Sequence, residues 1–383
     1  MSRVRASMGF VGGLLLLVAA CAPEPADDAP GEVVAPFRSE TVLPPPTSAP
    51  PPSFTVLATG DVLIHPALTA QAIEDGGGRR DFTNLFAGVR PAVQTADLAI
   101  CHLEVPLAGP NGPFQGFPLF YAPPEVATAL ARTGYDTCTT ASNHTFDHGA
   151  AGVRSTLDAL DRAGIRHTGS ARTRQEALTP LISEANGVKV GQVSFTFGFN
   201  LGTREPEPWM SNELDVNAVL AAARATKRAG AEVVIASLHW GEEHRADPTP
   251  EQRSIADRLL ADPAVDLVIG HHAHVVQPFE KLHGKWVAYG LGNHVARHEQ
   301  PRGTTEEGVM ARFRFVKEAD GWTAQSAEYL PTLVDLGPPI RLKDLSRNIE
   351  FDPARADVAI DRIDQVVRAR AGINEGLTRP VIG

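Results

Sequence analysis

Continuously apolar segments alternate with amphipathic segments along the chain from Phe54 onward. Continuous apolar runs of this length are typical of strands in a sheet that is buried on both faces. The runs are FTVLATGDVLI (54–64), ADLAICHLEV (96–105), YDTCTTASN (135–143), KVGQVSFTF (189–197), EVVIASLHW (232–240) and VDLVIGHHA (265–273). Helices are predicted between them, as over 215–230, where Asp opens the pattern and Gly closes it. This alternation predicts an α/β fold in which helices cover the sheets.

The pattern changes after Gly270. Residues 279–293 and 309–330 are each predicted to form a β-hairpin, with turns at His283-Gly284 and at Ala319-Asp320-Gly321. An antiparallel C-terminal half predicts a second sheet that packs on the first. A last amphipathic helix is expected from about residue 353 to 370. Because no internal repeat or second linker interrupts the pattern, residues 54–383 are predicted to form one domain.

The first twenty residues have the pattern of a secretory signal peptide. Arg3 and Arg5 precede a short apolar run, and small residues follow it. The run is shorter than the roughly 20 residues that a bilayer-spanning helix needs. Val18-Ala19-Ala20-Cys21 resembles a bacterial lipobox, in which Cys21 becomes the lipidated first residue. The alternative is an ordinary signal peptide with a chance cysteine near the cut.

A proline-rich segment follows, over residues 21–53. It contains ten of the 31 prolines and few large apolar side chains, so it buries too little surface to offset the entropy of ordering it. An extended tether of polyproline character is expected there. Together with a lipid on Cys21, it would hold the domain off a membrane. Ala22 stands where Asp is sometimes linked to inner-membrane retention, so an outer-membrane or cell-surface lipoprotein is favoured.

Charge and cysteine content narrow the possibilities further. A formal net charge of −10 and a pI near 5.7 argue against a nucleic-acid partner, which would require a basic face. Besides Cys21, the chain has Cys101 and Cys138, and both lie in predicted buried strands. Free thiols are favoured for that reason, although an exported protein could pair them. The oligomeric state stays open.

Polar side chains follow the carboxyl ends of five of the predicted strands, where α/β sheets bind their ligands. They are Asp61, Glu104, Asn143 with His144, His239, and His272 with His274. Each is weak evidence alone, and His148, His167, His283 and His298 are expected to be structural or surface residues. Together, carboxylate, amide oxygen and imidazole suit Mn, Fe or Zn. One or two divalent cations are therefore predicted at this edge.

The ordered segments TGDVLI, CHLEVPL, SNHTFDHG, SLHWGEEH, IGHHAHVVQP and YGLGNH closely resemble the CapA family of capsule and poly-γ-glutamate synthesis proteins. That family in turn resembles a branch of the calcineurin-like metallophosphoesterases. The resemblance extends from about Phe54 to about Asn293. It implies a four-layer α/β/β/α sandwich of the metallo-dependent phosphatase type.

The resemblance also implies roles for individual residues. His144 matches the general acid or transition-state-stabilising histidine, and Glu104 takes the position of the bridging carboxylate. Asp147 and Glu243 either orient histidines from behind or are solvated surface carboxylates. The implied metal ligands are Asp61, Glu104, Asn143, His239, His272 and His274.

This chain departs from the phosphoesterase pattern at three positions. Leu63 stands where a ligand histidine is usual, Glu104 replaces an aspartate, and His271 replaces the glycine before the closing His-x-His. His65 is one candidate for the missing imidazole. A single metal, or a weakened second site, is therefore possible.

Three functions fit these observations. The first is a metal-dependent hydrolase, acting on a phosphoester or a related ester or amide bond in the cell envelope. The second is a non-catalytic, metal-containing accessory protein that binds or exports an anionic polymer. The third, a solute-binding lipoprotein, leaves the histidine clusters unexplained.

Overall fold

The computed structural model describes residues 50–200, 206–347, 351–371 and 376–380. Internal contacts divide the chain into Met1–Ala49 and Pro50–Gly383, and only the second unit is described below. The predicted signal peptide, Cys21 and most of the tether lie outside the described residues. Within the described residues, no helix has both the length and the apolar character needed to cross a membrane.

The first sheet has the strand order β14-β13-β12-β1-β2-β3-β4. Its parallel part is built from β1 (Ser53–Val62), β2 (Leu98–Leu103), β3 (Thr137–Thr139) and β4 (Arg166–Thr168). Its antiparallel part is built from β12 (Glu307–Glu318), β13 (Gly321–Asp335) and β14 (Arg341–Asp344). Two short strands pair beside this row, β11 (Asn293–Val295) with β1 and β15 (Leu377–Thr378) with β13.

The second sheet has the order β5-β6-β7-β8-β10-β9. Its centre is parallel and consists of β6 (Val188–Thr196), β7 (Val233–His239), β8 (Leu267–His271) and β10 (Lys285–Ala288). Antiparallel strands form its edges, β5 (Leu181–Ala185) and β9 (Phe279–Leu282).

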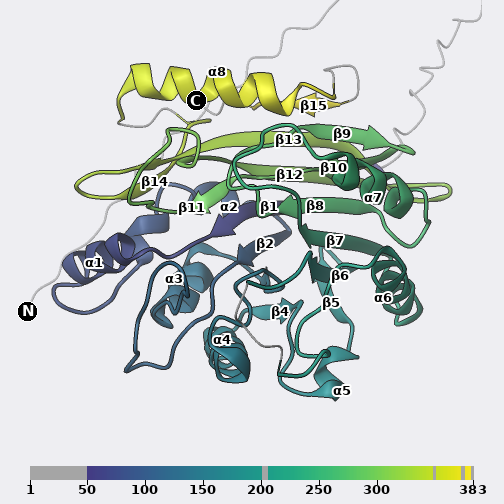
Figure 1. The fold of residues 1–383 in the computed structure, drawn as a ribbon. Helices are drawn as coiled ribbons and strands as arrows, with labels where there is room; N and C mark the ends of the chain where they lie inside the picture. The colour runs from purple at the N-terminus through teal and green to yellow at the C-terminus, as the bar shows by residue number, and fades with distance from the viewer. Residues whose placement is uncertain (1–49, 201–205, 348–350, 372–375, 381–383) are drawn as a thin grey trace, which may run out of the picture. The chain divides into compact units, whose positions relative to one another are not determined.

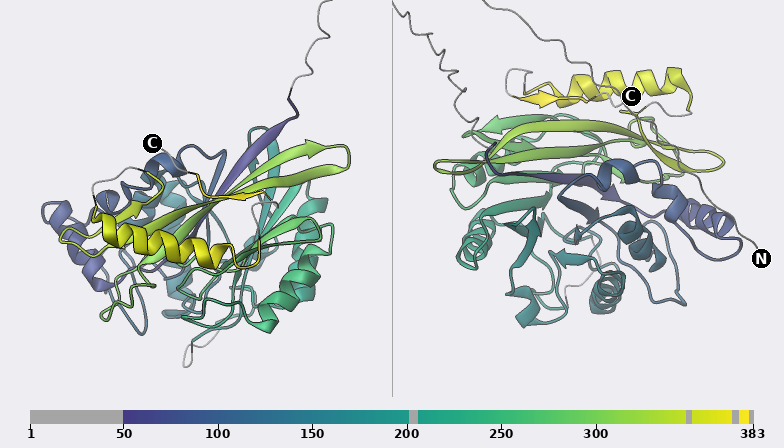
Figure 2. Two further views of the ribbon diagram at one scale, coloured as in Figure 1. Left: turned by 90° about the horizontal axis from the view of Figure 1, so that it is seen from above. Right: turned by 180° about the vertical axis from the view of Figure 1, so that it is seen from behind.

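The two sheets pack face to face, and helices cover their outer faces (Figures 1 and 2). The first sheet is covered by α1 (Pro66–Asp75), the short helices η1 (Thr83–Phe86) and α2 (Arg90–Val93), α3 (Glu125–Thr133) and α4 (Gly149–Ala163). The second is covered by α6 (Val216–Arg228) and α7 (Pro250–Leu260). The one-turn helix α5 (Arg174–Ala177) precedes β5, and α8 (Pro353–Val367) lies over β13. The four-layer α/β/β/α fold expected from the sequence is confirmed.

Strand β1 shows how the sequence produces these layers. Phe54, Val56 and Ala58 face the core between the sheets, whereas Leu57 faces the helices. Alternate residues of a strand point to opposite faces, so a strand in the middle layers needs apolar side chains on both. The continuous apolar run over 54–64 is the consequence.

The predicted hairpins exist, but the prediction that they form a separate second sheet is wrong. Strands β9 and β10 join the second sheet, because β10 pairs in parallel with β8. Strands β12 and β13 extend the first sheet, because β12 pairs antiparallel with β1. Each hairpin therefore completes a sheet begun by earlier strands. The short strands β4 and β5 were missed, since Arg166, His167 and Thr168 give no apolar signal.

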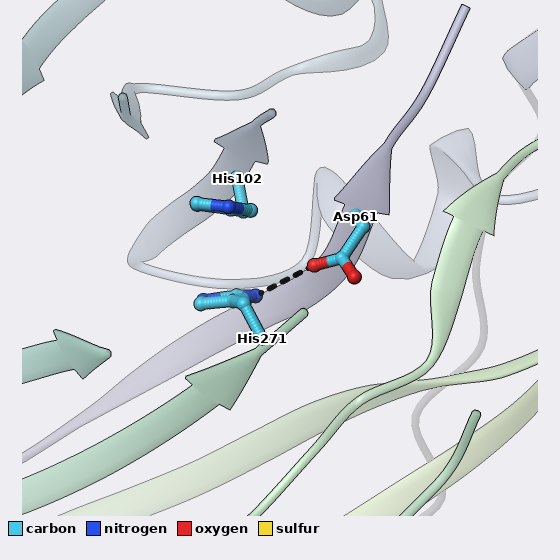
Figure 3. A group of neighbouring side chains, drawn as sticks. All are labelled: Asp61, His102 and His271. Atoms are coloured by element: carbon cyan, nitrogen blue, oxygen red, sulfur yellow. Dashed lines mark ion pairs between the residues drawn. The ribbon is translucent and has the colours of Figure 1, made fainter. Parts of the chain in front are cut away.

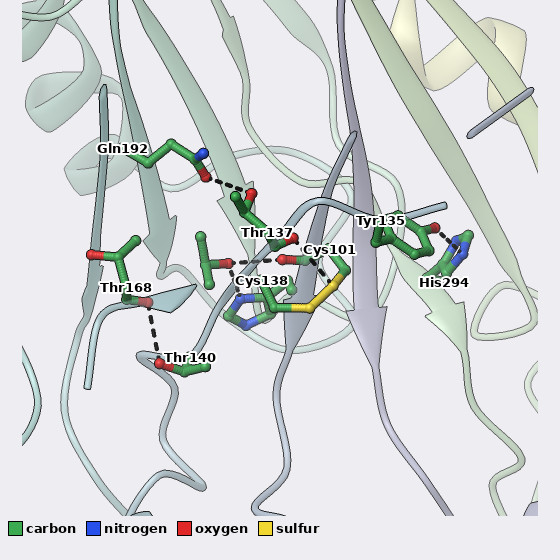
Figure 4. Close-up of a disulfide and its surroundings, with 10 residues drawn as sticks. Cys101, Tyr135, Thr137, Cys138, Thr140, Thr168, Gln192 and His294 are labelled. Atoms are coloured by element: carbon green, nitrogen blue, oxygen red, sulfur yellow. Dashed lines mark hydrogen bonds between the residues drawn. A yellow bond between two sulfur atoms is a disulfide. The ribbon is translucent and has the colours of Figure 1, made fainter. Parts of the chain in front are cut away.

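The expectation that Cys101 and Cys138 are free thiols is also wrong in this structure. The two residues face each other in the register of β2 and β3, and their sulfur atoms are bonded (Figure 4). Their Cα atoms are 4.5 Å apart, within the range that a disulfide spans. Burial of each cysteine was visible in the sequence, whereas their adjacency depends on the strand register. The disulfide joins the two strands that lead to Glu104 and Asn143.

Candidate metal centre

The sandwich brings all six predicted metal ligands to one edge. Asp61 lies near the end of β1, Glu104 directly after β2, and Asn143 four residues after β3. His239 ends β7, and His272 and His274 follow β8 from the opposite sheet. None of the six is more than 5% exposed. The parallel strands of both sheets thus end at a shared, buried polar site.

Asp61, Glu104 and His274 form one group of convergent ligand atoms. Nε2 of His274 lies 3.6 Å from Oε1 of Glu104, and Nδ1 of His274 lies 3.3 Å from Oδ2 of Asp61. One ligand atom from each residue falls within 4.8 Å of the other two. Glycine is required beside this group, because a Cβ at Gly60 would lie 1.9 Å from the carbonyl oxygen of Gly292.

His239, Asn143 and His272 lie next to this group. Nε2 of His239 is 2.8 Å from Oδ1 of Asn143, and the rings of His239 and His272 are 4.7 Å apart. The exposed Glu243 reaches this side, with a carboxylate oxygen within 4.8 Å of ligand nitrogens of His272 and His274. Its carboxylate therefore faces the site, as a residue that orients histidines would, but it remains open to solvent.

The turn after β8 holds its two histidines in a strained backbone conformation. His272 has a φ of 88° and His274 a φ of 55°, values that side-chain-bearing residues rarely adopt. The backbone N–H of His272 donates to Oδ2 of Asp61 at 3.1 Å, which ties this turn to β1. The contact between the two sheets therefore fixes where both imidazoles point.

Several buried polar atoms of the site have no hydrogen-bond partner within the described residues. They are both carboxylate oxygens of Glu104, Oδ1 of Asp61, and Nδ1 of His271 and of His272. Buried polar groups are almost always paired, and an unpaired buried carboxylate is costly. A cation would pair with these oxygens, and the mixed oxygen and nitrogen donors suit a divalent ion such as Mn, Fe or Zn. The residues present therefore fit a divalent metal.

The electrostatics of these side chains by themselves favour a proton in the place that a cation would take. Burial raises the pKa of Glu104 well above its ordinary value. Burial would also raise the pKa of Asp61, but the neighbouring imidazoles of His271 and His274 outweigh it and lower that pKa. Burial opposes charge on His274, yet Glu104 and Asp61 together raise its pKa to about 10. A metal must displace this proton in order to bind.

His144 and Asp147 form a separate pair beside the ligands. Nδ1–H of His144 donates to Oδ2 of Asp147 at 2.6 Å, and the Asp147 side chain is fully buried. The backbone N–H of Phe120 donates to the same carboxylate at 2.8 Å, and Asn200 donates to its other oxygen at 3.2 Å. Asp147 is thus a buried carboxylate that orients His144, and it is not a solvated surface residue.

Sequence reasoning assigned no role to three further polar residues of the site. His102 and His271 stack with ring centroids 4.0 Å apart, and Nδ1 of His271 lies 3.3 Å from Oδ1 of Asp61 (Figure 3). The nearly parallel rings cannot both direct in-plane lone pairs at one ion, so we assign them no cation of their own. Asn293, in the YGLGNH segment, accepts a hydrogen bond from Nδ1 of His274 at 2.9 Å. In the sequence, Asn293 stood out only as part of that segment.

Leu63 and His65 lie on the wall of the adjoining cavity. Leu63 is buried and offers no ligand, as its sequence position indicated. Nδ1 of His65 accepts from the backbone N–H of Arg297 at 3.2 Å. Among the described residues, His65 belongs to no group of convergent ligand atoms, so the structure does not bring it to the missing position.

A cavity of about 780 Å³ opens beside these ligands. Its lining includes His144, His274, Glu243, Arg297 and Arg302. The aromatic rings of Phe117 and Phe120 form an apolar wall, and Phe117 is 80% exposed. A substrate larger than a single phosphate group fits in this space.

The sequence profile of a family described as "Bacterial capsule synthesis protein PGA_cap" matches residues 55–298, which hold all six predicted metal ligands and His144. The chain belongs to the PGA_cap family. The resemblance to CapA proteins is thereby confirmed.

Relatives of this PGA_cap protein include two CapA proteins from Bacillus. It is 31% identical to the capsule biosynthesis protein CapA of Bacillus anthracis over 175 residues, which cover 45% of this chain and 42% of that protein. It is 24% identical to the PGA biosynthesis protein CapA of Bacillus subtilis over 267 residues, which cover 68% of each chain. A probable polyglutamine synthesis accessory protein of Mycobacterium tuberculosis is 29% identical over 53% of this chain and 56% of its own length.

Among solved structures, the calcineurin-like phosphoesterase YfkN from Bacillus subtilis is similar at 16% identity and a TM-score of 0.45. The match covers 82% of this chain and 98% of that one. A 5'-nucleotidase precursor from Thermus thermophilus is similar at 14% identity and a TM-score of 0.44, over 82% of this chain and 58% of that one. At these values neither neighbour informs the activity of this chain. Its fold is established by its own four layers.

Proposed function

We propose that this PGA_cap protein is a metal-dependent hydrolase that acts on a phosphoester, or a related ester or amide bond, in the cell envelope. The buried oxygens of Glu104 and Asp61 that lack a hydrogen-bond partner carry this proposal, because they face the imidazole of His274, which lines a cavity. In a metal-free cluster, ion pairs with histidines offset part of the cost of burying these carboxylates, and both oxygens of Glu104 still lack a hydrogen-bond partner among the described residues.

The proposed ligands divide into two groups. Asp61, Glu104 and His274 would hold one ion, and Asn143, His239 and His272 lie where they would hold a second, of Mn, Fe or Zn. A divalent cation supplies Lewis acidity and neutralises an anionic group. Asn293 fixes the ring of His274, because it takes the Nδ1–H and leaves Nε2 facing Glu104.

His144 is the proposed proton donor to the leaving group. Its Nδ1–H is engaged by Asp147, so Nε2 is the atom that it can present to the cavity. The buried Asp147 holds the ring and stabilises positive charge on it. The ring of Phe120 packs against His144 edge-on, with the centroids 4.9 Å apart, and limits access of water on that side.

Arg297 and Arg302 are the proposed binding groups for an anionic part of the substrate. Both line the cavity, and neither forms an ion pair within the described part of the chain. A planar guanidinium suits carboxylate and phosphate groups equally well. The two arginines bring positive charge into a cavity whose lining also includes Glu243 and Glu299.

Elemental analysis of protein purified without chelators tests the metal, and turnover of a generic aryl phosphate with Mn or Zn tests the activity. We expect one or two transition-metal ions per chain and metal-dependent turnover that EDTA abolishes. A chain that takes up no transition metal even after reconstitution would overturn the proposal.

A second candidate function is metal-assisted binding of an anionic polymer without turnover. Arg297 and Arg302 favour it, since they form no ion pair within the described residues and can bind an anionic polymer without catalysing a reaction. Bound metal, absence of turnover, and retention on an immobilised anionic polymer such as polyglutamate would together favour this function over hydrolysis.

We further propose that the protein is an envelope lipoprotein attached through Cys21, on the outer membrane or the cell surface. The lipobox-like sequence before Cys21 and the proline-rich tether support this location. Labelling of cells with a fatty-acid probe tests it, with Cys21→Ser as the comparison. Equal labelling of both proteins would contradict lipidation at this residue.

A further inference from the structure

A row of buried polar contacts runs behind the proposed ligand His239. Oγ1 of Thr139 lies 2.8 Å from Nδ1 of His102, and Nε2 of His102 lies 3.0 Å from Nδ1 of His239. Nε2 of His239 then lies 2.8 Å from Oδ1 of Asn143. Thr139 and His102 pair in register on β3 and β2, whereas His239 comes from the other sheet. The row therefore links the two sheets at the site.

Two directions of hydrogen bonding are possible along this row. A neutral imidazole carries one N–H and one acceptor nitrogen, so each ring donates through only one of its two nitrogens. In the first direction the Thr139 hydroxyl donates to His102, His102 donates to His239, and Nε2–H of His239 donates to Asn143. In that direction Nε2 is protonated and cannot bind a cation.

In the second direction the Thr139 hydroxyl turns to the carbonyl oxygen of Cys101, 3.4 Å away. Nδ1–H of His102 then donates to Thr139, and Nδ1–H of His239 donates to Nε2 of His102. Each ring and the hydroxyl still carry one hydrogen, so no net proton is released.

The second direction leaves Nε2 of His239 as a bare acceptor beside Asn143. The amide of Asn143 is oriented by Nδ2, which donates to Oδ1 of Asn200 at 2.9 Å, so Oδ1 is the atom facing His239. Two acceptors 2.8 Å apart repel each other unless a cation lies between them. Only the second direction is compatible with a cation on this pair.

We propose that His102 is a positioning residue that holds His239 in its Nδ1–H tautomer and frees Nε2 for the cation, with Thr139 setting the direction of the row. Cation binding selects the second direction, and the metal-free protein uses the first. The inference rests on the proposed metal site. It adds that a hydroxyl without any contact to the ligand set controls metal affinity.

The test compares Thr139→Val, Thr139→Ser and a matched control, Thr137→Val. Thr137 is equally buried on the same strand, but its hydroxyl donates to Gln192 and does not join the row. Zinc affinity is measured by chelator competition on the full chain. We expect Thr139→Val to weaken zinc binding about 10-fold, within the range for residues behind a ligand, with Thr139→Ser and Thr137→Val close to wild type.

Nitrogen-15 NMR of labelled histidines supplies a readout that a purely structural role would not move. His239 and His102 should show Nδ1–H with zinc and Nε2–H without it, in wild type and in Thr139→Ser. Equal zinc affinity in Thr139→Val and wild type, or unchanged tautomers on zinc binding, would overturn the proposed role of this row of contacts and leave the metal site standing. A wild-type chain that binds no metal would overturn both the proposed role of the row and the metal site.

Discussion

Nε2 of His274 faces Oε1 of Glu104 at 3.6 Å, with no hydrogen-bond donor to that oxygen among the described residues. The opposite nitrogen of the same ring donates to Asn293. His274 is thus held from behind and directed at a buried carboxylate, which is the arrangement of a metal ligand with its supporting residue.

Asn293→Ala should weaken metal binding about 10- to 100-fold, because His274 loses the acceptor that fixes its ring. Titration with zinc or manganese in competition with a chelator measures the change. Asn293→Asp keeps an acceptor and should retain most of the affinity. Equal affinities for wild type and Asn293→Ala would show that Asn293 does not support the site.

Glu104→Gln should reduce bound metal more strongly, since it removes a charged ligand whose two oxygens have no other partner among the described residues. Elemental analysis after reconstitution gives the stoichiometry. Glu306→Gln is a matched control, because Glu306 is also buried but accepts from Gly303 and Thr305. Loss of metal in both variants would point to a general effect of buried glutamates.

The metal-free protein should lose stability as pH rises from about 6.5 to 10. In the folded state the pKa of His274 is raised to about 10, so the stabilisation is complete below 6.5 and disappears as the proton leaves. Glu104, whose pKa is also raised, acts in the same direction from its ordinary value upward. Urea unfolding in EDTA at several pH values measures the slope, at most about 1.4 kcal/mol per pH unit and proton.

His274→Gln should flatten this slope between pH 6.5 and 10. An equally steep loss of stability in this variant would place its origin in other groups.

His144→Ala should keep its metal and lose about 10²- to 10⁴-fold in turnover, because it removes a proton donor and no ligand. Aryl phosphate turnover and metal content are measured on the same sample. His148→Ala is the control, since His148 stacks on Tyr121 with ring centroids 3.9 Å apart and does not line the cavity. Unchanged turnover in His144→Ala would remove His144 from the mechanism.

Replacing both Cys101 and Cys138 with Ala, in a Cys21→Ser background, should cost roughly 3–4 kcal/mol of unfolding free energy. Their sequence separation of 37 residues sets this scale through the entropy of the unfolded chain. Urea unfolding of the oxidised protein provides the comparison. Two free thiols in the unreduced, unfolded parent protein would contradict the disulfide.

Much of the fold follows from local patterns. The continuous apolar runs place the six main strands, and the helix between β6 and β7 begins at its Asp215 cap as expected. The strands that pair with the C-terminal hairpins could not be predicted from such local patterns. An alternating pattern shows that a strand has a partner but does not identify it, and the structure pairs β12 with β1.

The sequence also predicted part of the site and left the rest undetermined. The six predicted ligands converge, because the ends of parallel strands meet at one edge, and their residue types alone indicate a divalent ion. His102, His271 and Asn293 were present in the motifs without any sign of their roles. Each acts through a partner distant in sequence, as His102 does through His239, 137 residues away.

The sequence by itself determined the layers, the family and the set of side chains that fit a metal, because these depend on local periodicity and on residue chemistry. Only the tertiary structure decided that Cys101 pairs with Cys138, that Asp147 is buried behind His144, and that Thr139 reaches His239 through His102. Such contacts depend on strand register and on how two sheets face each other, and the local order of residues determines neither.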